Sequence, residues 1–228
     1  MNDTNNIFSL QYYESIIVKA LQGGYEFCTI EKFLDKGCPK EKHFILRHDL
    51  DVKPLTLKRT LKVEDKYDIK STIFVRVTAN EYNLLSYPVF RMIKDAHKNG
   101  HEVGLHTSFV EYSKINKLEP LQVLEAEVNL LKNFFKIKGI APHRDLNYAF
   151  NSLPFIEQNW QDLKRMGLEY QAYERRILDS VVYINEGFNP HLCWRGERPE
   201  EVIKSKSSIC MLTHNHWWYE EHPFEDLV

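Results

Sequence analysis

Carboxylate and imidazole side chains gather in two short stretches of the chain, residues 47–51 (RHDLD) and residues 100–107 (GHEVGLHT). Each stretch follows or contains an apolar run typical of a buried strand, which places its polar groups at the carboxyl end of that strand. α/β barrels build their active sites at this end of their strands. Aspartate and histidine together suit a divalent metal of the zinc type, and a metal with an open position suits hydrolysis. The two stretches therefore predict a metal-dependent hydrolase.

The first stretch carries two aspartates, Asp49 and Asp51, separated by one residue. In an extended segment residues two apart face the same way, so both carboxylates can converge on one point together with Arg47. Two carboxylates so close repel each other unless a cation neutralises them, which favours one metal ligand and one general base. The alternative interpretation pairs Asp49 with Arg47 and gives Asp51 a capping role before Pro54.

The second stretch favours the metal interpretation. His106 emerges at the end of its expected strand, whereas His101 lies at the opposite end and is expected to be structural. A single buried histidine is more often a hydrogen-bonded core residue than a ligand. A histidine at the equivalent strand end, soon after an Asp-x-Asp motif, is better explained as a metal ligand.

Two more expected strands end in the same way, at residues 141–145 (APHRD) and 211–218 (MLTHNHWW). The first offers imidazole, guanidinium and carboxylate groups together, and the second offers two histidines. We expect His216, Trp217 and Trp218 to line a sugar pocket, because aromatic faces stack on the apolar faces of sugars. The alternative is that the tryptophans belong to the core.

Short apolar runs alternate with amphipathic helical patterns, and this alternation predicts parallel strands joined by right-handed crossovers. Two helices stand out, over residues 88–99 and 120–135, each with an apolar stripe at helical spacing. The expected strands are Phe44–Arg47, Thr72–Val77, Glu102–His106, Gly139–Pro142, Glu169–Ala172, Val181–Ile184 and Ile209–Thr213.

A chain of 228 residues suits one well-buried core and is short for two, so we expect one catalytic domain over residues 1–228. The predicted fold class is α/β, a distorted (β/α)7-type barrel, and an open doubly wound sheet is the rival. Residues 1–43 precede the first strand as a helical segment, and residues 10–34 are expected to form a helix pair packed on the barrel.

Composition excludes several classes of function. Hydrophobic residues make up 43% and charged residues 27% of the chain, as in an ordinary globular domain, and the net charge of -2 gives no basic surface for nucleic acid. The four cysteines form no CxxC pair, so we expect thiols in a reducing compartment. Neither a signal peptide nor an apolar run long enough for a membrane span is visible, and the expected location is the cytoplasm.

The ordered set RHDLD, GHEVGLHT, PHR and LTHNHWW resembles the motifs of the polysaccharide deacetylase superfamily (carbohydrate esterase family four, the chitooligosaccharide deacetylase homology domain). It is most similar to the uncharacterised branch whose first motif reads Arg-His-Asp-x-Asp, and the resemblance runs from about residue 44 to residue 218. It implies a distorted (β/α) barrel, a zinc or similar divalent ion, and removal of N- or O-acetyl groups. The implied partner is a sugar or glycan substrate.

In that family the first motif has adjacent aspartates, a general base followed by a metal ligand. Here Leu50 separates them, and the resemblance makes Asp49 the base and Asp51 the ligand. The second motif, His-Ser/Thr-x-x-His, puts one histidine ligand at His106 and the other at Val110, which cannot bind a metal. The chain therefore needs a replacement ligand or binds no metal.

His143 is the expected replacement, because it lies at the next strand end. The resemblance gives Arg144 the task of holding the base carboxylate, although the family's Arg-x-Pro order is not preserved. His214 matches the histidine of the last motif, which acts as general acid. Zn2+ is the expected cofactor for such a mixed nitrogen and oxygen ligand set.

Two other functions are compatible with the sequence. An Asp-x-Asp motif also serves metal-dependent glycosyltransferases, but histidines at several strand ends argue against that class. The second alternative is a catalytically silent barrel that binds a carbohydrate or a protein partner, with Val110 marking the lost site. Charged groups buried without a purpose would cost several kcal/mol, which argues against a silent site.

Overall fold

The computed structural model describes residues 8–143, 152–186, 194–222 and 225. Its elements follow one another in the order α1 (Leu10–Gln22), β1 (Glu26–Cys28), α2 (Ile30–Asp35), β2 (His43–Leu50), η2 (Pro54–Thr56), α3 (Leu57–Lys66), β3 (Thr72–Arg76), α4 (Tyr87–Lys98), β4 (Glu102–Thr107), α5 (Phe109–Asn116), α6 (Pro120–Lys132), β5 (Gly139–Pro142), α7 (Ser152–Gln158), α8 (Trp160–Arg165), β6 (Tyr170–Gln171), α9 (Arg175–Leu178), β7 (Val182–Glu186), β8 (Trp194–Arg195), α10 (Pro199–Ser205), β9 (Ile209–His214) and η3 (Asn215–Trp217).

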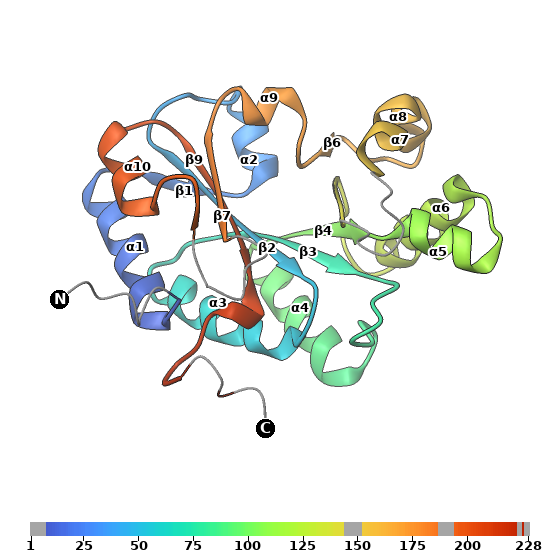
Figure 1. The fold of residues 1–228 in the computed structure, drawn as a ribbon, viewed down its shortest axis with the longest axis horizontal. Helices are drawn as coiled ribbons and strands as arrows, with labels where there is room; N and C mark the ends of the chain where they lie inside the picture. The colour runs from blue at the N-terminus through green and yellow to red at the C-terminus, as the bar shows by residue number, and fades with distance from the viewer. Residues whose placement is uncertain (1–7, 144–151, 187–193, 223–224, 226–228) are drawn as a thin grey trace.

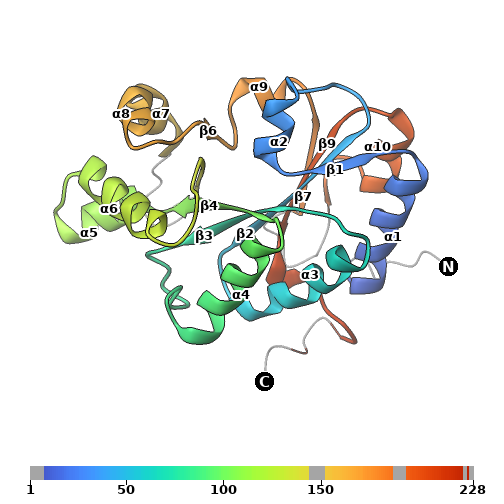
Figure 2. The ribbon, with the colours of Figure 1, turned by 180° about the vertical axis from the view of Figure 1, so that it is seen from behind.

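Within the described residues, the strands form one sheet in the order β6-β5-β4-β3-β2-β9-β7-β8, with β1 paired to the first part of β2. Strands β7 and β8 are antiparallel, and the other pairs in this part of the chain are parallel. The sheet curls into a half-barrel with helices packed around it, as Figures 1 and 2 show from opposite sides. The predicted α/β fold class, with a distorted barrel, is confirmed.

The predicted strands are all present, with ends shifted by a few residues, and the two predicted helices correspond to α4 and α6. The N-terminal segment differs from the predicted helix pair, because β1 lies between α1 and α2. Gly23 caps α1, and Gly24 follows with a φ of 77°, which turns the chain so that β1 can pair with β2. Strand β8 was not predicted, since a strand of two residues is too short to show an alternation of apolar and polar side chains.

The helices are amphipathic and bury one side against the sheet or against another helix. In α1 the side chain of Ser9 caps the first turn by accepting a hydrogen bond from the backbone N–H of Tyr12. The buried residues of α1 then recur at helical spacing: Tyr13, Ile16, Ile17 and Ala20. Among the described residues, none of the helices combines the length and the apolar character that crossing a membrane requires.

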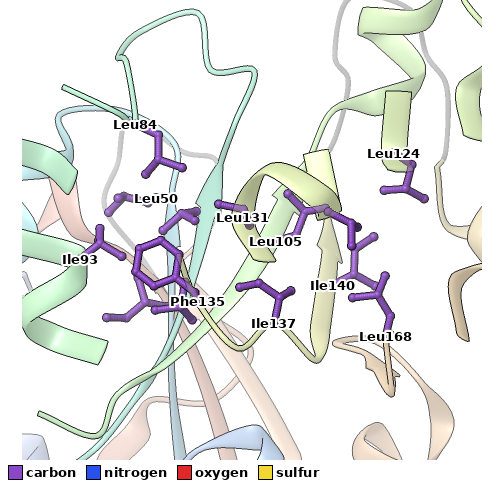
Figure 3. Packing of buried hydrophobic residues seen from close by; sticks show 14 of the residues in the cluster. Leu50, Leu84, Ile93, Leu105, Leu124, Leu131, Phe135, Ile137, Ile140 and Leu168 are labelled. Carbon is purple, nitrogen blue, oxygen red and sulfur yellow. The ribbon is translucent and has the colours of Figure 1, made fainter. Parts of the chain in front are cut away.

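Successive residues of the central strands face opposite sides of the sheet. The convex side is mostly apolar, apart from the buried His48, Glu64 and His101, and α3, α4 and α6 cover it with the core cluster that Figure 3 shows from close by. Leu50, Ile93, Leu105, Leu131 and Ile140 belong to this cluster. Burying a side chain of this size contributes about 2 kcal/mol, so the cluster holds the strands in the register that sets where each one ends.

The concave side of the same strands changes from apolar to polar along their length. Ile45 and Phe74 lie in an apolar cluster that α2 and α9 help to build. Arg47 and Asp49 then follow Ile45 on the same face of β2, because residues two apart in a strand point the same way. The polar groups are thereby placed at the carboxyl ends of the strands.

Candidate active site

Polar side chains from five parallel strands converge at the carboxyl end of the concave face. The register aligns Asp49 of β2 with His214 of β9, and Arg76 of β3 with His106 of β4. Strand β5 pairs with β4, and His143 directly follows it. Parallel strands bring their carboxyl ends to one edge of a sheet, so residues far apart in the sequence meet at this edge.

Asp51, His106 and His143 form a group that could hold a metal ion, since one ligand atom from each lies within 4.8 Å of the others. His106 Nε2 lies 3.1 Å from Asp51 Oδ1, and His143 Nε2 lies 3.7 Å from Asp51 Oδ2. These three residues are the metal ligands that the sequence predicts, and the structure brings them together.

The hydrogen-bonding state of this group fits a cation. His106 Nδ1 lies 2.8 Å from the carbonyl oxygen of Ala141, which can only accept, so Nδ1 carries the hydrogen. In the neutral form that a metal ligand requires, this imidazole has its Nε2 lone pair directed at Asp51 Oδ1. Asp51 Oδ1 is buried and has no hydrogen-bond partner in the described part of the chain. A divalent ion satisfies both lone pairs, and a carbonyl at Nδ1 is the usual support of a metal-bound histidine.

Asp51 is held in its ionised form. Burial by itself favours the protonated acid, but His106, His214 and His143 outweigh burial and hold the pKa of Asp51 well below its usual range. Metal ligands must be deprotonated to bind, so a bound cation would take the place of the protons that His106 and His143 carry when they stabilise ionised Asp51.

Asp49 is held by Arg47 of the same strand. The Nε and Nη2 atoms of Arg47 donate hydrogen bonds of 2.8 and 2.7 Å to the two oxygens of Asp49. Both side chains are buried, and the guanidinium lies over the rings of Tyr173 and Phe74. Burial favours protonated Asp49, but Arg47 outweighs it, and the pKa of Asp49 is lowered. The pairing with Arg47 that the sequence left open is therefore observed, and the carboxylate stays ionised.

Among the described residues, Arg47 supports Asp49. Arg144, which the resemblance assigns to this carboxylate, lies outside the described residues, and Arg47 makes the contact. A glycine of the second motif contributes indirectly, because a Cβ at Gly104 would collide with the ring of Phe74. The Phe74 ring lies against the guanidinium of Arg47, which donates hydrogen bonds to Asp49. Gly104 therefore leaves space for the ring that positions Arg47.

His214 lies at the end of β9, beside the group that could hold a metal. Its Nε2 is 3.4 Å from Asp51 Oδ2, and its Nδ1 is 3.5 Å from Glu186 Oε1, which also accepts the backbone N–H of His214. Burial lowers the pKa of His214, but Glu186 and the two aspartates outweigh burial and raise it to about 9. At neutral pH the imidazolium therefore has a proton to donate, which the predicted role of general acid requires.

The aromatic residues that follow His214 divide between the site and the core. His216 and Trp217 are half-buried, with ring centres 4.5 Å apart, and their predicted contact with a substrate stays a prediction. Burial, with His214 nearby, lowers the pKa of His216 to about 4, so His216 is neutral at pH 7. Trp218 is fully buried in the second core cluster and donates from Nε1 to Thr213. The predicted pocket role is wrong for Trp218, because its ring presents no surface to a substrate.

Val110 occupies the position of the family's second histidine ligand, and the structure places it in the core. It is 1% exposed in α5 and belongs to the cluster that fills the convex side. A ligand at this position would have to leave the core to reach Asp51. His143, at the end of β5, supplies the third ligand atom of the group instead.

Three buried polar residues near the site were missed in the sequence: Glu186 at the end of β7, Arg76 at the end of β3, and Ser108 directly after β4. The rule that found the histidines, a polar residue at the carboxyl end of a strand, also applies to these three residues. It did not identify Glu186 in the sequence because the predicted strand ended at Ile184, two residues too early.

No protein-family model matches the chain, and no curated protein matches its sequence. Among solved structures, the chain is similar to a mutant of the peptidoglycan deacetylase PdaC from Bacillus subtilis, with 15% sequence identity and a TM-score of 0.32. The similarity covers 77% of this chain and 89% of that chain. A TM-score this low does not establish a common fold.

Proposed function

We propose that the protein is a metal-dependent hydrolase that removes an acetyl group, N-acetyl in preference to O-acetyl, from a sugar or glycan intermediate. The observation that carries the proposal is the unsatisfied 3.1 Å contact between His106 Nε2 and Asp51 Oδ1 in a group with His143. Asp49 lies 3.6 Å from His106, and His214 lies 3.4 Å from Asp51. Amide hydrolysis needs an electrophile, a base and an acid in such proximity.

Asp51, His106 and His143 would hold the ion, and Zn2+ suits one carboxylate with two imidazoles. A divalent ion in such a site supplies Lewis-acid chemistry, acidifying water and polarising a carbonyl oxygen. Three protein ligands are also the number found in catalytic zinc sites, whereas structural sites use four.

Asp49 is the proposed general base. Each oxygen of a carboxylate has two lone-pair positions, so the two hydrogen bonds from Arg47 leave an acceptor position on each oxygen. The Oδ2 atom, 3.6 Å from His106 Nε2, faces the group and can receive the proton of an attacking water. Arg47 fixes the direction of this lone pair, because both of its donors engage the same carboxylate.

His214 is the proposed general acid. The proton that leaves comes from Nε2, the atom that faces Asp51, and goes to the departing amine of the sugar. Glu186 faces Nδ1 on the other side of the ring and stabilises the imidazolium. The Glu186 carboxylate therefore keeps the acid charged until the proton is transferred.

The choice of substrate is supported by the motifs rather than by the geometry. The ordered set of four motifs resembles enzymes that act on acetylated sugars, and Trp217, half-buried beside His216, is a suitable stacking surface for a sugar ring.

The test begins with elemental mass spectrometry of the purified protein and of His106→Ala. About one zinc or similar ion per chain in the wild type, lost in the variant, is expected. Hydrolysis of N-acetylated oligosaccharides is then measured for wild type, Asp49→Asn and His214→Gln. Both variants should keep the metal and lose turnover by at least about 100-fold, in the range of general acid–base contributions.

Three results would count against the proposal. No metal in the wild type after reconstitution with zinc, iron, cobalt or nickel would favour a sugar- or protein-binding module. Loss of the metal in Asp49→Asn, with folding unchanged by circular dichroism, would exchange the roles of the two aspartates. Unchanged turnover in His214→Gln would remove the assigned acid.

A further inference from the structure

We propose that Ser108 and Arg76 are positioning residues that turn Nε2 of His143 toward Asp51. The inference rests on the proposed function, and it explains how a histidine outside the family's second motif can serve as a ligand. It is carried by a continuous series of contacts, from Arg76 to Ser108, from Ser108 to His143, and from His143 to Asp51.

Arg76 is the first member of the series. It ends β3 beside His106 in the sheet, and its side chain is 5% exposed. Its Nη2 donates a hydrogen bond of 3.0 Å to Ser108 Oγ, and its Nη1 lies 3.4 Å from Glu81 Oε2. A guanidinium has donors and no acceptor, so Ser108 Oγ must accept in this contact. Arg76 therefore fixes the position of the Ser108 oxygen and occupies one of its two lone pairs.

Ser108 is the second member. It follows β4 directly, it is buried, and its Oγ lies 3.3 Å from Nδ1 of His143. With one lone pair occupied by Arg76, the hydroxyl oxygen can accept the hydrogen of Nδ1 with the other. A neutral His143 in that tautomer presents its Nε2 lone pair 3.7 Å from Asp51 Oδ2. In this proposal the Ser108 hydroxyl has the accepting role in this contact, and that direction favours the tautomer that can bind a metal.

His106 is supported in the same way by a different group. Its Nδ1 faces the carbonyl oxygen of Ala141 at 2.8 Å, and its Nε2 faces the other oxygen of Asp51. The backbone N–H of His143 also donates a 2.8 Å hydrogen bond to the carbonyl of Thr107, which ties His143 to the end of β4. Two imidazoles with acceptors at Nδ1 and with Nε2 atoms directed at one carboxylate have the outer support that ligand histidines need.

The test compares zinc affinity, measured by competition with a chromophoric chelator, in wild type, Ser108→Ala and Ser108→Thr. Ser108→Ala should bind zinc about 10- to 100-fold more weakly, the range for losing an outer partner of a ligand histidine. Ser108→Thr keeps the hydroxyl and should restore most of the affinity. Ser113→Ala is the matched control, because Ser113 is a buried serine of α5 that donates to the carbonyl of Val110.

The positioning role of Arg76 is tested by comparing its substitution with and without the Ser108 hydroxyl. Because Arg76 acts on the ligand through the hydroxyl, Arg76→Met should weaken zinc binding in the wild-type background and add little in the Ser108→Ala background. The unfolding free energy of each metal-free variant is measured alongside, so that a loss of zinc affinity is separated from a loss of folding.

The outcomes separate this inference from the proposed function. Equal zinc affinity in wild type and Ser108→Ala overturns the positioning role and leaves the proposed function intact. A loss that Ser108→Thr fails to restore, or that Ser113→Ala shares, overturns it equally. A wild type that binds no zinc overturns the proposed function, and the positioning role with it.

Discussion

Two clusters of carboxylates and imidazoles lie on opposite faces of β2, and they differ in their exposure to solvent and in the groups that contact the carboxylate. His48 and Asp49 are consecutive in the strand, so their side chains point to opposite sides. On the convex side His48 meets Glu64 of α3, and on the concave side Asp49 belongs to the candidate active site. Both clusters combine carboxylates with imidazoles.

The cluster around Glu64 is closed to solvent, and one oxygen of Glu64 makes two short contacts, although Glu64 Oε2 and His48 Nδ1 have no hydrogen-bond partner among the described residues. Glu64 Oε1 accepts a 2.7 Å hydrogen bond from the Tyr13 hydroxyl and lies 2.7 Å from His48 Nε2, and all three side chains are fully buried. His101 beside them accepts the backbone N–H of Ser71 at its Nδ1. Burial favours protonated Glu64, but His48 outweighs it and lowers the pKa of Glu64. This cluster holds α1 and α3 against the sheet without any ligand.

The cluster around Asp51 also combines a carboxylate with imidazoles, but it is partly open to solvent. Three imidazole nitrogens, from His106, His214 and His143, lie 3.1, 3.4 and 3.7 Å from its oxygens. The nearest oxygen has no aligned hydrogen bond among the described residues, and the side chain is 14% exposed. Glu64 has a hydroxyl donor and an imidazole nitrogen at 2.7 Å and no exposed surface, whereas Asp51 lies beside three imidazoles and is partly open to solvent, from which a cation can enter.

The largest expected effect is on folding, from Glu64→Ala. The change removes the acceptor of the buried Tyr13 hydroxyl and leaves His48 without its carboxylate, which should lower the free energy of unfolding by about 3–5 kcal/mol. Urea unfolding at pH 7 measures it. Glu169→Ala, which removes an exposed carboxylate paired with Lys138, is the control and should change the same quantity by less than about 1 kcal/mol. A small loss in Glu64→Ala would remove the distinction between the two clusters.

The second effect is on metal binding, from Asp51→Asn. Zinc affinity should fall by more than about 100-fold, because a direct ligand is lost and outer partners alone account for 10- to 100-fold. The unfolding free energy of the metal-free protein should also fall, because the lowered pKa of Asp51 means that the histidines stabilise its ionised form in the folded state. Unchanged zinc affinity with a large loss of stability would mean that Asp51, like Glu64, stabilises the fold and does not bind the metal.

Glu127 is a third buried carboxylate, and its surroundings differ from those of Glu64 and Asp51. It is as buried as Glu64, but it accepts hydrogen bonds from the hydroxyls of Thr107 and Thr78 rather than from imidazoles. Burial outweighs these donors and raises its pKa from 4.5 to about 7. The folded protein therefore binds this proton more tightly than the unfolded chain. The associated stability is fully present below about pH 4.5 and is lost as the pH rises through 7.

Glu127→Gln should remove that pH dependence. From pH 4.5 to above 7, the wild type should lose about 3 kcal/mol of unfolding free energy through this group, at roughly 1.4 kcal/mol per pKa unit. The variant should show a correspondingly flatter profile in urea unfolding at pH 5 and pH 8. Parallel pH profiles of the unfolding free energy for wild type and variant would mean that Glu127 does not cause the pH dependence. The two hydroxyl donors would then be enough to keep a buried carboxylate ionised, without imidazoles.

The ligand group was predictable because it depends on strand ends. Asp51, His106 and His143 follow apolar runs that the sequence shows clearly, and parallel strands bring such ends together whatever the loops between them do. The curled α/β sheet was predictable for the same reason. His101 and His106 were also separated correctly, because they lie at opposite ends of one strand.

The parts that were not predictable depend on packing. Trp218 looks like a pocket residue beside His216, and its burial follows from contacts with Phe8 and Tyr13 of the N-terminal segment, far away in the sequence. Glu186 lies at the end of a strand that extends past its own apolar run because it pairs with β9 as far as Asn185 and with β8 at Glu186. Such residues become visible once the neighbours of each element are known.

The smallest expected effect comes from Trp217, which is adjacent to the fully buried Trp218 but half-buried itself. Its ring contacts the ring of His216, and one aromatic pair is worth about 1 kcal/mol, so Trp217→Ala should lower the unfolding free energy by about that amount. Zinc affinity should not change, because neither ring belongs to the ligand group. Tyr87→Ala, at an aromatic residue that is 73% exposed, serves as control. A loss of about 3–5 kcal/mol, as for a buried aromatic residue, would assign Trp217 to the core with Trp218 and leave the proposed sugar site without its stacking surface.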